Sequence, residues 1–324
     1  MSVKSELLKL LNSSGENFVS GGDIAKKLSV SRNAVWKAIQ SLRADGYNIT
    51  AVTNKGYKLS DSGDVLSALG IMGHIKTENV FNIEVRNVVT STNTILRELA
   101  SDGEREGYVL AAQEQTAGKG RQGRKFYSPA GHGVYFSLLL RPGVRASDAS
   151  LITSAAAVAA ARAIEEVIGV DVGIKWVNDL FVEGKKVCGI LTEAVFDMES
   201  GLVESVVLGI GINITRPKPG FPEEIRDIAT ALTDRSIGKD SERCRLIAAT
   251  LNNFWGFYQN LEKREFLDEY RSRSIILDKE INVISFNNIR PAKAIEIDNN
   301  CGLLVRYESG EETVLSSGDV SIRV

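Results

Sequence analysis

The apolar positions of the first 60 residues recur at helical intervals and then begin to alternate. Helical spacing is found in Val3–Leu11, in Ile24–Leu28, and at Val35, Ile39 and Leu42. These intervals predict three short helices, and Ser31 is the expected N-cap of the third. Residues 47–59 alternate like two strands around an Asn-Lys-Gly turn at 54–56. The order is therefore helix, helix, helix and wing.

The following 200 residues mix strand and helix patterns. The polar stretch Ser-Asp-Ser-Gly-Asp at 60–64 is the expected boundary of a first domain, 1–60. Beyond it, the Ala-rich segment Ser150–Ile168 predicts a helix that ends at Gly169. The amphipathic stretch from Ser241 to about Arg271 predicts one long helix. A central α/β or α+β domain is therefore expected at 65–272.

The last 50 residues lack a helical period. Short alternating segments separated by turns predict four strands, at Glu280–Ile284, Ala292–Ile297, Leu303–Tyr307 and Glu312–Leu315. We expect residues 275–324 to fold as a small β-barrel domain.

The composition is that of a globular protein with a basic N-terminal segment. Of the 324 residues, 43% are hydrophobic and 25% are charged, which disfavours disordered and fibrous classes. Residues 1–60 carry nine Lys and Arg against four Asp and Glu, and the remainder carries 30 against 37. This asymmetry is compatible with nucleic-acid binding and equally with a solvated basic face.

Cysteine usage and hydropathy are typical of the cytoplasm. The three cysteines, Cys188, Cys244 and Cys301, form no C-x-x-C pair, so neither a disulfide framework nor a zinc site is predicted. The N-terminus lacks the apolar core of a signal peptide, and the most apolar stretch, 154–164, is short and contains Arg162. We expect a cytoplasmic protein that does not cross a membrane.

A glycine-rich basic loop at 118–125, Gly-Lys-Gly-Arg-Gln-Gly-Arg-Lys, precedes the predicted strand Gly133–Leu140. Glycines allow the backbone to approach a ligand closely, and interleaved Lys and Arg favour phosphate or carboxylate. The alternative is a mobile basic surface loop. The loop matches neither a Walker A motif nor the dinucleotide fingerprint. Gly209-Ile-Gly211 also fails that fingerprint, and Val206–Ile214 is predicted to be a buried strand instead.

Residues 175–193 predict a hairpin that turns at Glu183-Gly184. By the two-residue period of a strand, Lys186 and Cys188 are expected on one face. A lysine in this otherwise apolar segment needs an anionic partner or a ligand, unless it lies on an edge strand and extends to water. Upstream, Thr-Ser-Thr-Asn at 90–93 precedes an amphipathic helix, which its hydroxyls are expected to cap.

In this order along the chain, the segments 90–93, 118–125 and 175–193 resemble those that build the active site of the biotin protein ligases. The resemblance covers the whole chain, since the ligases that are also repressors share its layout. It implies an α+β multidomain fold: an N-terminal winged helix-turn-helix, a central class II synthetase-like α/β domain and a C-terminal SH3-like β-barrel. Two residues depart from the family pattern. Lys119 stands where Arg is frequent, and Val177 replaces Pro, which puts affinity rather than activity in doubt.

The resemblance also implies residue roles. The residues that hold the biotin ring system are matched by Ser91, Thr92, Asn93 and Gln115, and the loop that closes over biotin and its adenylate by Lys119, Gly120 and Arg121. Lys186 matches the lysine that reaches the biotin carboxylate. We expect Lys186 and Arg121 to be catalytic, and Asp179 to assist either the metal or the incoming amine. The alternative for Asp179 is a turn carboxylate that follows Asn178.

The implied reaction has two halves. Biotin and ATP, with Mg²⁺ brought by the nucleotide, give biotinyl-adenylate and pyrophosphate, and a lysine of a biotin carboxyl carrier protein then displaces AMP. The implied second activity is repression, with the adenylate as corepressor of a homodimer on operator DNA. Ser31, Arg32, Asn33 and Lys37 are the expected DNA contacts, with Val35 facing inward. Two alternatives stay open, a lipoate ligase and a repressor that binds biotin without turnover.

Overall fold

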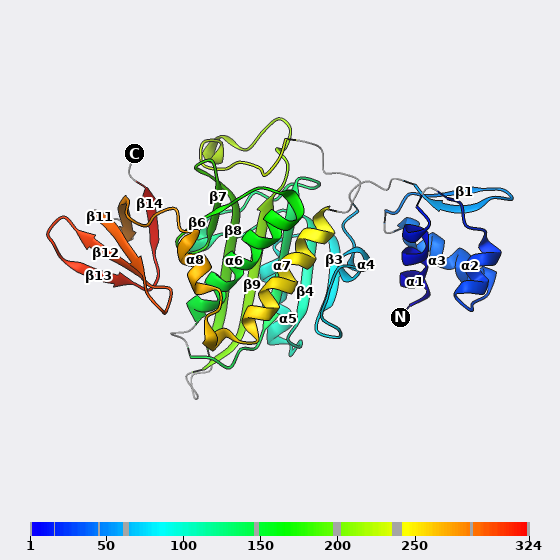
Figure 1. Cartoon of the computed structure of the whole chain (residues 1–324), viewed down its shortest axis with the longest axis horizontal. Helices are drawn as coiled ribbons and strands as arrows, with labels where there is room; N and C mark the ends of the chain where they lie inside the picture. Colours follow the sequence, from blue (N-terminus) through cyan, green and yellow to red (C-terminus); the bar gives the residue numbers. More distant parts are fainter. Residues whose placement is uncertain are drawn as a thin grey trace. The chain divides into compact units, whose positions relative to one another are not determined.

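The computed structural model describes residues 2–15, 17–44, 46–60, 65–145, 149–196, 202–234, 242–285 and 288–322. It divides into two units (Figure 1). The first comprises Met1–His74 and Ile237–Arg245, and the second comprises Ile75–Ser236 and Leu246–Val324. Most of the predicted linker, 61–64, and the expected helix start at Ser241 lie outside the described residues.

The first unit contains the predicted three helices and wing. Its elements are α1 Val3–Ser13, α2 Gly21–Lys27, α3 Arg32–Ala44, β1 Ile49–Val52, β2 Gly56–Leu59 and α4 Ala68–Met72. Ser31 caps α3 as expected, because its hydroxyl accepts a hydrogen bond from the Ala34 amide at 3.2 Å. Leucine and isoleucine side chains at the predicted apolar positions are buried between the helices. The predicted N-terminal fold is confirmed.

A seven-stranded mixed sheet forms the centre of the second unit. Its order is β3-β4-β5-β9-β8-β7-β6, and the only parallel pair within it is β3 with β4. The strands are β3 Asn82–Val89, β4 Tyr108–Gln115, β5 Gly133–Leu140, β6 Gly173–Lys175, β7 Asp179–Val182, β8 Lys185–Phe196 and β9 Val203–Asn213. The strand predicted at Gly133–Leu140 is therefore confirmed, and so is the hairpin turn at Glu183-Gly184, where both residues have positive φ.

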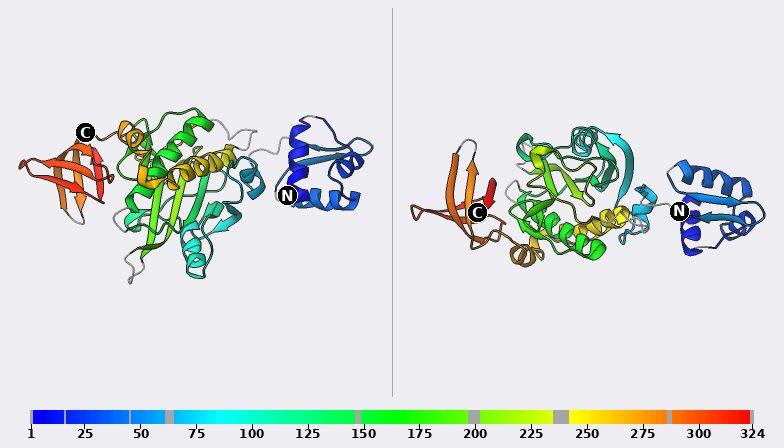
Figure 2. Two further views of the ribbon diagram at one scale, coloured as in Figure 1. Left: turned by 60° about the horizontal axis from the view of Figure 1, so that its bottom comes forward. Right: turned by 90° about the horizontal axis from the view of Figure 1, so that it is seen from above.

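Helices cover both faces of this sheet. Figures 1 and 2 show α6 Ala149–Ile168 and α7 Glu242–Tyr258 side by side on one face, with α5 Thr92–Ser101 on the other. The alanines of α6 from Ala155 to Ala163 are fully buried, because small side chains let a helix lie close against a sheet. The helix ends before Gly169, whose φ is +77°, as predicted. Within the described residues, no helix is long and apolar enough to span a membrane.

The expected single helix from Ser241 to about Arg271 is a wrong prediction. The chain forms α7 to Tyr258, a 3₁₀ turn at Leu261–Lys263 and then α8 Leu267–Ser272, and Arg264 adopts a left-handed conformation at φ 54°. The apolar period continues through the break because Leu261 and Phe266 are themselves buried. Hydrophobic spacing alone therefore does not reveal where the helix ends.

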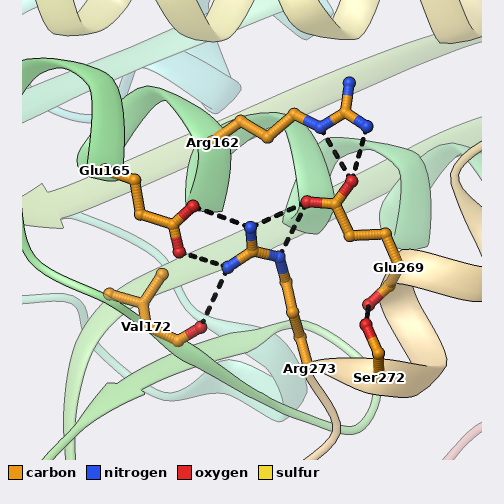
Figure 3. A network of polar contacts seen from close by, with 6 residues as sticks. All are labelled: Arg162, Glu165, Val172, Glu269, Ser272 and Arg273. Atoms are coloured by element: carbon orange, nitrogen blue, oxygen red, sulfur yellow. Dashed lines mark hydrogen bonds and ion pairs between the residues drawn. The ribbon is translucent and has the colours of Figure 1, made fainter.

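An ion-pair network holds α6 against α8 (Figure 3). The Arg273 guanidinium donates to Glu165 Oε2 at 2.7 Å and to Glu269 Oε1 at 2.8 Å. Glu269 also accepts a 2.8 Å hydrogen bond from Arg162 Nε. The backbone carbonyl of Arg273 accepts from the Ile174 amide of β6 at 2.8 Å. The network therefore fixes the edge strand β6, whose neighbour β7 carries part of the site described below.

The C-terminal residues form a separate five-stranded antiparallel sheet. Its order is β13-β12-β11-β10-β14, with β10 Glu280–Ser285, β11 Asn288–Ile297, β12 Leu303–Tyr307, β13 Glu312–Leu315 and β14 Asp319–Ile322. All four predicted strands are present. The fifth, β14, is missing from the prediction because four residues, Asp-Val-Ser-Ile, are too short to show a period, and they become a strand by pairing with β10.

Candidate functional site

A cavity of about 810 Å³ opens on the central sheet. It is lined by the start of α5, the glycine-rich loop, strands β6 to β9, the segment Phe221–Ala229 and β14. Every ligand-binding and catalytic residue expected from the sequence lies on it, namely Ser91, Thr92, Asn93, Gln115, Lys119, Gly120, Arg121, Asp179 and Lys186. The structure therefore brings together three runs that are far apart in the chain.

Hydrogen bonds fix the polar end of the cavity. The backbone N–H of Thr92 donates to Gln115 Oε1 at 2.8 Å, and the Thr92 hydroxyl donates to the same oxygen at 3.2 Å. The buried Ser137 hydroxyl lies 2.7 Å from Thr92 Oγ1 and 2.6 Å from Asn93 Oδ1, toward both of which it can donate. Because the Thr92 proton is directed toward Gln115, the Thr92 hydroxyl is left to present a lone pair, which suits a ligand that carries N–H donors.

The expected capping role of the 90–93 hydroxyls is wrong for Ser91. Ser91 is the N-cap residue of α5 by backbone conformation, but its side chain makes no capping hydrogen bond. The residue is only 2% exposed and lines the cavity. The first amide of the helix, that of Thr92, donates to Gln115 from across the site.

The floor of the cavity is built from glycines that the sequence did not identify as site residues. Gly209 and Gly211 lie within the predicted buried strand, now β9, and Gly189 faces Gly211 from β8. A Cβ on Gly209 would come within 2.0 Å of Asn93 Oδ1, and one on Gly211 within 2.5 Å of the Phe126 ring. The available signal was glycine inside a strand, which indicates close approach of another group.

Lys186 forms an ion pair with Asp179 across the hairpin. The distance from Lys186 Nζ to Asp179 Oδ1 is 2.7 Å, and the two side chains are 30% and 19% exposed. The turn-carboxylate alternative for Asp179 is thereby replaced by a charged role within the cavity. Asp179 also orients the ammonium, since a carboxylate at this distance restricts its position.

The expectation that Lys186 and Cys188 share a face is wrong. The β7–β8 pairing shifts register, with Leu180 opposite Cys188 and Phe181 opposite Lys186, so one residue of β8 is extra. This bulge places Lys186 over Gly189, whose added Cβ would be 3.0 Å from the Lys186 ammonium. Cys188 is instead fully buried, and burial raises the pKa of its thiol.

The glycine-rich loop lines the cavity and makes hydrogen bonds within itself and to neighbouring segments. The Gly120 amide donates to the Arg124 carbonyl at 2.7 Å, and Gln122 has a φ of 54°. Arg121 Nη1 donates to Asn178 Oδ1 at 3.0 Å, and Arg124 pairs with Asp319 of β14. The loop therefore lies on the cavity, and the C-terminal sheet contributes to the site through Asp319.

Lys175 is a further cation that the sequence did not single out. It is half-buried on the cavity wall, and its Nζ lies 5.6 Å from the centre of the Phe181 ring. Burial lowers its pKa, and the nearby charges of Asp179 and Asp319 oppose that effect only in part. The apolar side chains Phe221, Ile225 and Ile228 also line the cavity. The cavity thus has a polar end, a set of cations and an apolar wall.

The first unit presents the predicted DNA-facing side chains on α3. Ser31, Arg32, Asn33 and Lys37 are exposed, and Val35 is 1% exposed and faces inward. Trp36, which sequence reasoning did not select, is 52% exposed beside them. Such a face, with basic, amide and aromatic groups on one helix, has the composition used for reading a DNA groove.

Comparisons with known proteins match both units. The family model described as "Biotin/lipoate A/B protein ligase family" matches residues 85–213, and one described as "HTH domain" matches residues 3–58. The "Bifunctional ligase/repressor BirA" of Bacillus subtilis (strain 168) is 35% identical over 319 residues, which are 97% of this chain and 97% of that protein. The protein of the same name from Escherichia coli (strain K12) is 30% identical over 332 residues, covering 99% and 97%.

A solved structure gives a consistent result for the second unit. "Biotin protein ligase from Aquifex aeolicus in complex with biotin and ATP" aligns with a TM-score of 0.60 at 28% identity, and covers 75% of this chain and 98% of that chain. Similarity in sequence to two bifunctional relatives and similarity in structure to a solved ligase are therefore two separate lines of support.

Proposed function

The chain belongs to the family of bifunctional ligase/repressors, and from this membership we propose how its cavity and its first unit perform the two activities. It is an ATP-dependent biotin protein ligase that is also a DNA-binding repressor of biotin genes. The observation that carries the ligase function is the cavity itself, in which an N–H-recognising end, the Lys186–Asp179 pair and the loop of Arg121 face one another.

Biotin binds with its cyclic urea at the polar end. The remaining lone pair of Thr92 accepts an N–H group of the urea, Gln115 fixes the direction of the Thr92 hydroxyl, and the glycines of β9 leave room for the rings. A lipoate ring has no N–H donor, so it would leave the remaining acceptor position of the buried Thr92 hydroxyl unfilled, at a cost of roughly 1–3 kcal/mol. This arrangement favours biotin over lipoate.

In the first half-reaction the biotin carboxylate attacks the α-phosphorus of ATP. A carboxylate–phosphate bond forms, the bond to the β-phosphate breaks, and pyrophosphate leaves with the electron pair. Two anions must meet, so the ammonium of Lys186 and the guanidinium of Arg121 offset their repulsion and hold them in line. The apolar surface of Phe221, Ile225 and Ile228 accommodates the adenine base.

In the second half-reaction a lysine amine of the biotin carboxyl carrier protein attacks the mixed anhydride. The new amide releases AMP, and a proton leaves the amine. Asp179 lines the cavity, and we expect its carboxylate, which is paired with Lys186, to receive that proton. The loop of Lys119, Gly120 and Arg121 shields the anhydride from water before the carrier arrives.

Magnesium is brought by ATP rather than held by a dedicated cage. Within the described ranges, no group of three or more His, Cys, Asp or Glu side chains could hold a metal. Phosphate oxygens and water satisfy most positions of Mg²⁺, so one carboxylate is sufficient. Asp179 would supply it, and the ion would neutralise phosphate charge.

Each of the three domains has a role in the proposed function. Residues 1–60 form the DNA-binding domain, 65–272 the catalytic domain and 275–324 an SH3-like domain whose Asp319 holds the loop through Arg124. Ser31, Arg32, Asn33 and Lys37 contact operator DNA. One winged helix covers about one half-site, so the repressor binds as a homodimer. Carrier protein and operator are both cytoplasmic, and so is this protein.

Exchange of pyrophosphate tracer into ATP tests the ligase function. The purified protein is incubated with ATP and either biotin or lipoate, and exchange is expected with biotin alone. Exchange with lipoate would make the chain a lipoate ligase, and binding of biotin without exchange would make it a repressor without turnover. Removal of residues 1–60 is expected to abolish operator binding and spare exchange, and specific DNA binding by that variant would refute the helix assignment.

A further inference from the structure

Lys175 is a cavity cation without an anionic partner. Among the residues that the structure describes, no hydrogen bond or salt bridge to its ammonium is found, and its nearest defined contact is the Phe181 ring. In contrast, Lys186 is paired with Asp179, and Arg124 with Asp319. The proposed reaction, as derived above, leaves Lys175 without a role.

An ammonium in this position costs free energy. Burial is the main cause of the lowered pKa of Lys175; the charges of Asp179 and Asp319 offset it in part, and repulsion from Lys186 and Arg124 adds to it. A partly buried charge without a counter-ion destabilises the fold, and such groups are retained where a ligand supplies the opposite charge. An anionic group bound in the cavity is therefore the expected partner.

The order of strands indicates which anion that is. Across the sheet, the ring-binding floor lies on β9, Lys186 on β8, Asp179 on β7 and Lys175 on the edge strand β6. Neighbouring strands are about 4.8 Å apart, so Lys175 is two strands, roughly 10 Å, beyond the strand of Lys186. The carboxylate thus approaches the α-phosphorus from the β9 side.

Displacement at phosphorus proceeds with the attacking and leaving oxygens roughly in line. The leaving group must then point away from β9, toward β6. As the bond from the α-phosphorus to the bridging oxygen breaks, the electron pair and its negative charge stay on that oxygen. The only protein cation that β6 contributes to the lining of the cavity is Lys175.

We propose that Lys175 binds the β- and γ-phosphates of ATP and stabilises the departing pyrophosphate, and that it acts only in the first half-reaction. The inference rests on the proposed ligase function. No pyrophosphate is present when the carrier lysine attacks the adenylate, so the second half-reaction does not need this side chain.

The test separates the two half-reactions in Lys175→Met, a neutral side chain of similar length. Biotin-dependent pyrophosphate exchange is expected to fall about 100-fold, the scale for loss of one preorganised charge at a transition state. Transfer from isolated biotinyl-adenylate to the carrier protein is expected to be unchanged. Binding of inorganic pyrophosphate with magnesium, measured by calorimetry, is expected to weaken about tenfold.

Two matched variants and one stability measurement complete the design. Lys185→Met removes a lysine of β8 that does not line the cavity, and should match wild type in all three assays. Lys175→Arg keeps the charge and should recover much of the exchange. The melting temperature of Lys175→Met should equal or exceed that of wild type, because the substitution removes a partly desolvated charge.

Three outcomes would overturn the inference. Unchanged exchange in Lys175→Met means that the side chain does not meet the leaving group. A parallel fall in transfer means that it holds the adenylate instead. A lowered melting temperature with loss of both half-reactions means that its role is structural. If wild type itself shows no biotin-dependent exchange, the proposed ligase function fails, which is a different result from all three.

Discussion

Some polar side chains at the site have their hydrogen-bonding groups paired with other groups of the protein. Asn93 is held on both sides of its amide, since it accepts from Ser137 and donates to Glu193 Oε2 at 2.8 Å. Gln115 is held likewise by Thr92 and by Ser128, whose Oγ accepts from it at 2.9 Å. Such groups have one orientation before any ligand arrives, which reduces the entropy lost on binding.

Replacing Lys186 by alanine is expected to cripple adenylate formation and leave the fold intact. The substitution removes the positive charge that faces the biotin carboxylate, and it also leaves the Asp179 carboxylate to repel that anion. Exchange of pyrophosphate should fall about 100- to 1000-fold. Circular dichroism should be unchanged, and Lys185→Ala is the control. Exchange at the wild-type rate would remove Lys186 from the reaction.

A methyl group at position 209 is expected to weaken biotin binding. The Cβ of Gly209→Ala would lie 2.0 Å from Asn93 Oδ1, so Asn93 must move and the polar end must shift with it. Overpacking of this kind costs about 1–3 kcal/mol, equivalent to roughly 5- to 150-fold in Kd. Calorimetric titration with biotin measures the effect. Gly256→Ala meets no atom within 4 Å and should bind biotin normally.

The residues that sequence reasoning could find at the site were those with unusual neighbours. Lys186 stood out as a charge in an apolar segment, and Arg121 stood out between glycines. Gly209 and Lys175 did not, because a glycine in a strand and a lysine before a tryptophan are common, and their meaning depends on what the fold places beside them. The prediction that Lys186 and Cys188 share one face was wrong because a bulge breaks the two-residue period.

Sequence periodicity predicted the presence of helices and strands better than it predicted where they end. Helix α3, strand β5 and the β7–β8 turn follow from local pattern, capping and turn chemistry. The end of α7 and the strand β14 do not, because each is decided by a distant contact. Leu261 and Phe266 continue the apolar period beyond a chain reversal, and Asp319–Ile322 becomes a strand only against β10.

The network between α6 and α8 is expected to stabilise the second unit in a pH-dependent way. Burial alone would raise the pKa of Glu269, but hydrogen bonds from Arg162 and Arg273 outweigh it, and the pKa is lowered from 4.5. A lowered carboxyl pKa contributes stability above its unfolded value, and this contribution is lost as pH falls through the folded value.

Arg273→Met should therefore destabilise the protein by about 2 kcal/mol near neutral pH, between the values for surface and buried pairs. Urea unfolding of both proteins from pH 7 to pH 3 measures the difference, which should shrink below pH 4.5. A difference that is constant across this range would mean that packing of the arginine stem, rather than its charge, holds the helices.

The glycine-rich loop is expected to retain the adenylate through one side chain. Arg121→Gly removes the guanidinium that lies beside Asn178, so the loop should close less well over an anionic intermediate and release it at least about tenfold faster. Rapid filtration of the enzyme–adenylate complex gives the rate. Gln122→Gly adds the same flexibility at a residue already at positive φ, and should retain the adenylate.

At the scale of the whole molecule, one chain joins the loop proposed to close over the adenylate to a DNA-binding unit, and the adenylate is expected to couple them. We expect repression to require two DNA-binding units, so the coupling should act through association of two chains. Strand β8 offers a surface for it. On the side opposite β9, no described strand pairs with its residues Leu191–Phe196, and Val195 and Phe196 are exposed there. An open strand edge pairs readily with a second copy.

Adenylate binding should promote this pairing because it fixes the loop, so that two chains lose less conformational entropy when they associate. Sedimentation and operator titration should show more dimer, and about 10- to 100-fold tighter DNA binding, in the adenylate-bound protein. Val195→Lys, which charges the β8 edge, should abolish both effects and retain biotin-dependent pyrophosphate exchange. Val88→Lys is the matched control, since Val88 is 58% exposed on β3 at the opposite edge of the sheet. Equal dimer populations and equal operator affinity with and without adenylate would mean that the DNA-binding unit responds to something other than biotin status.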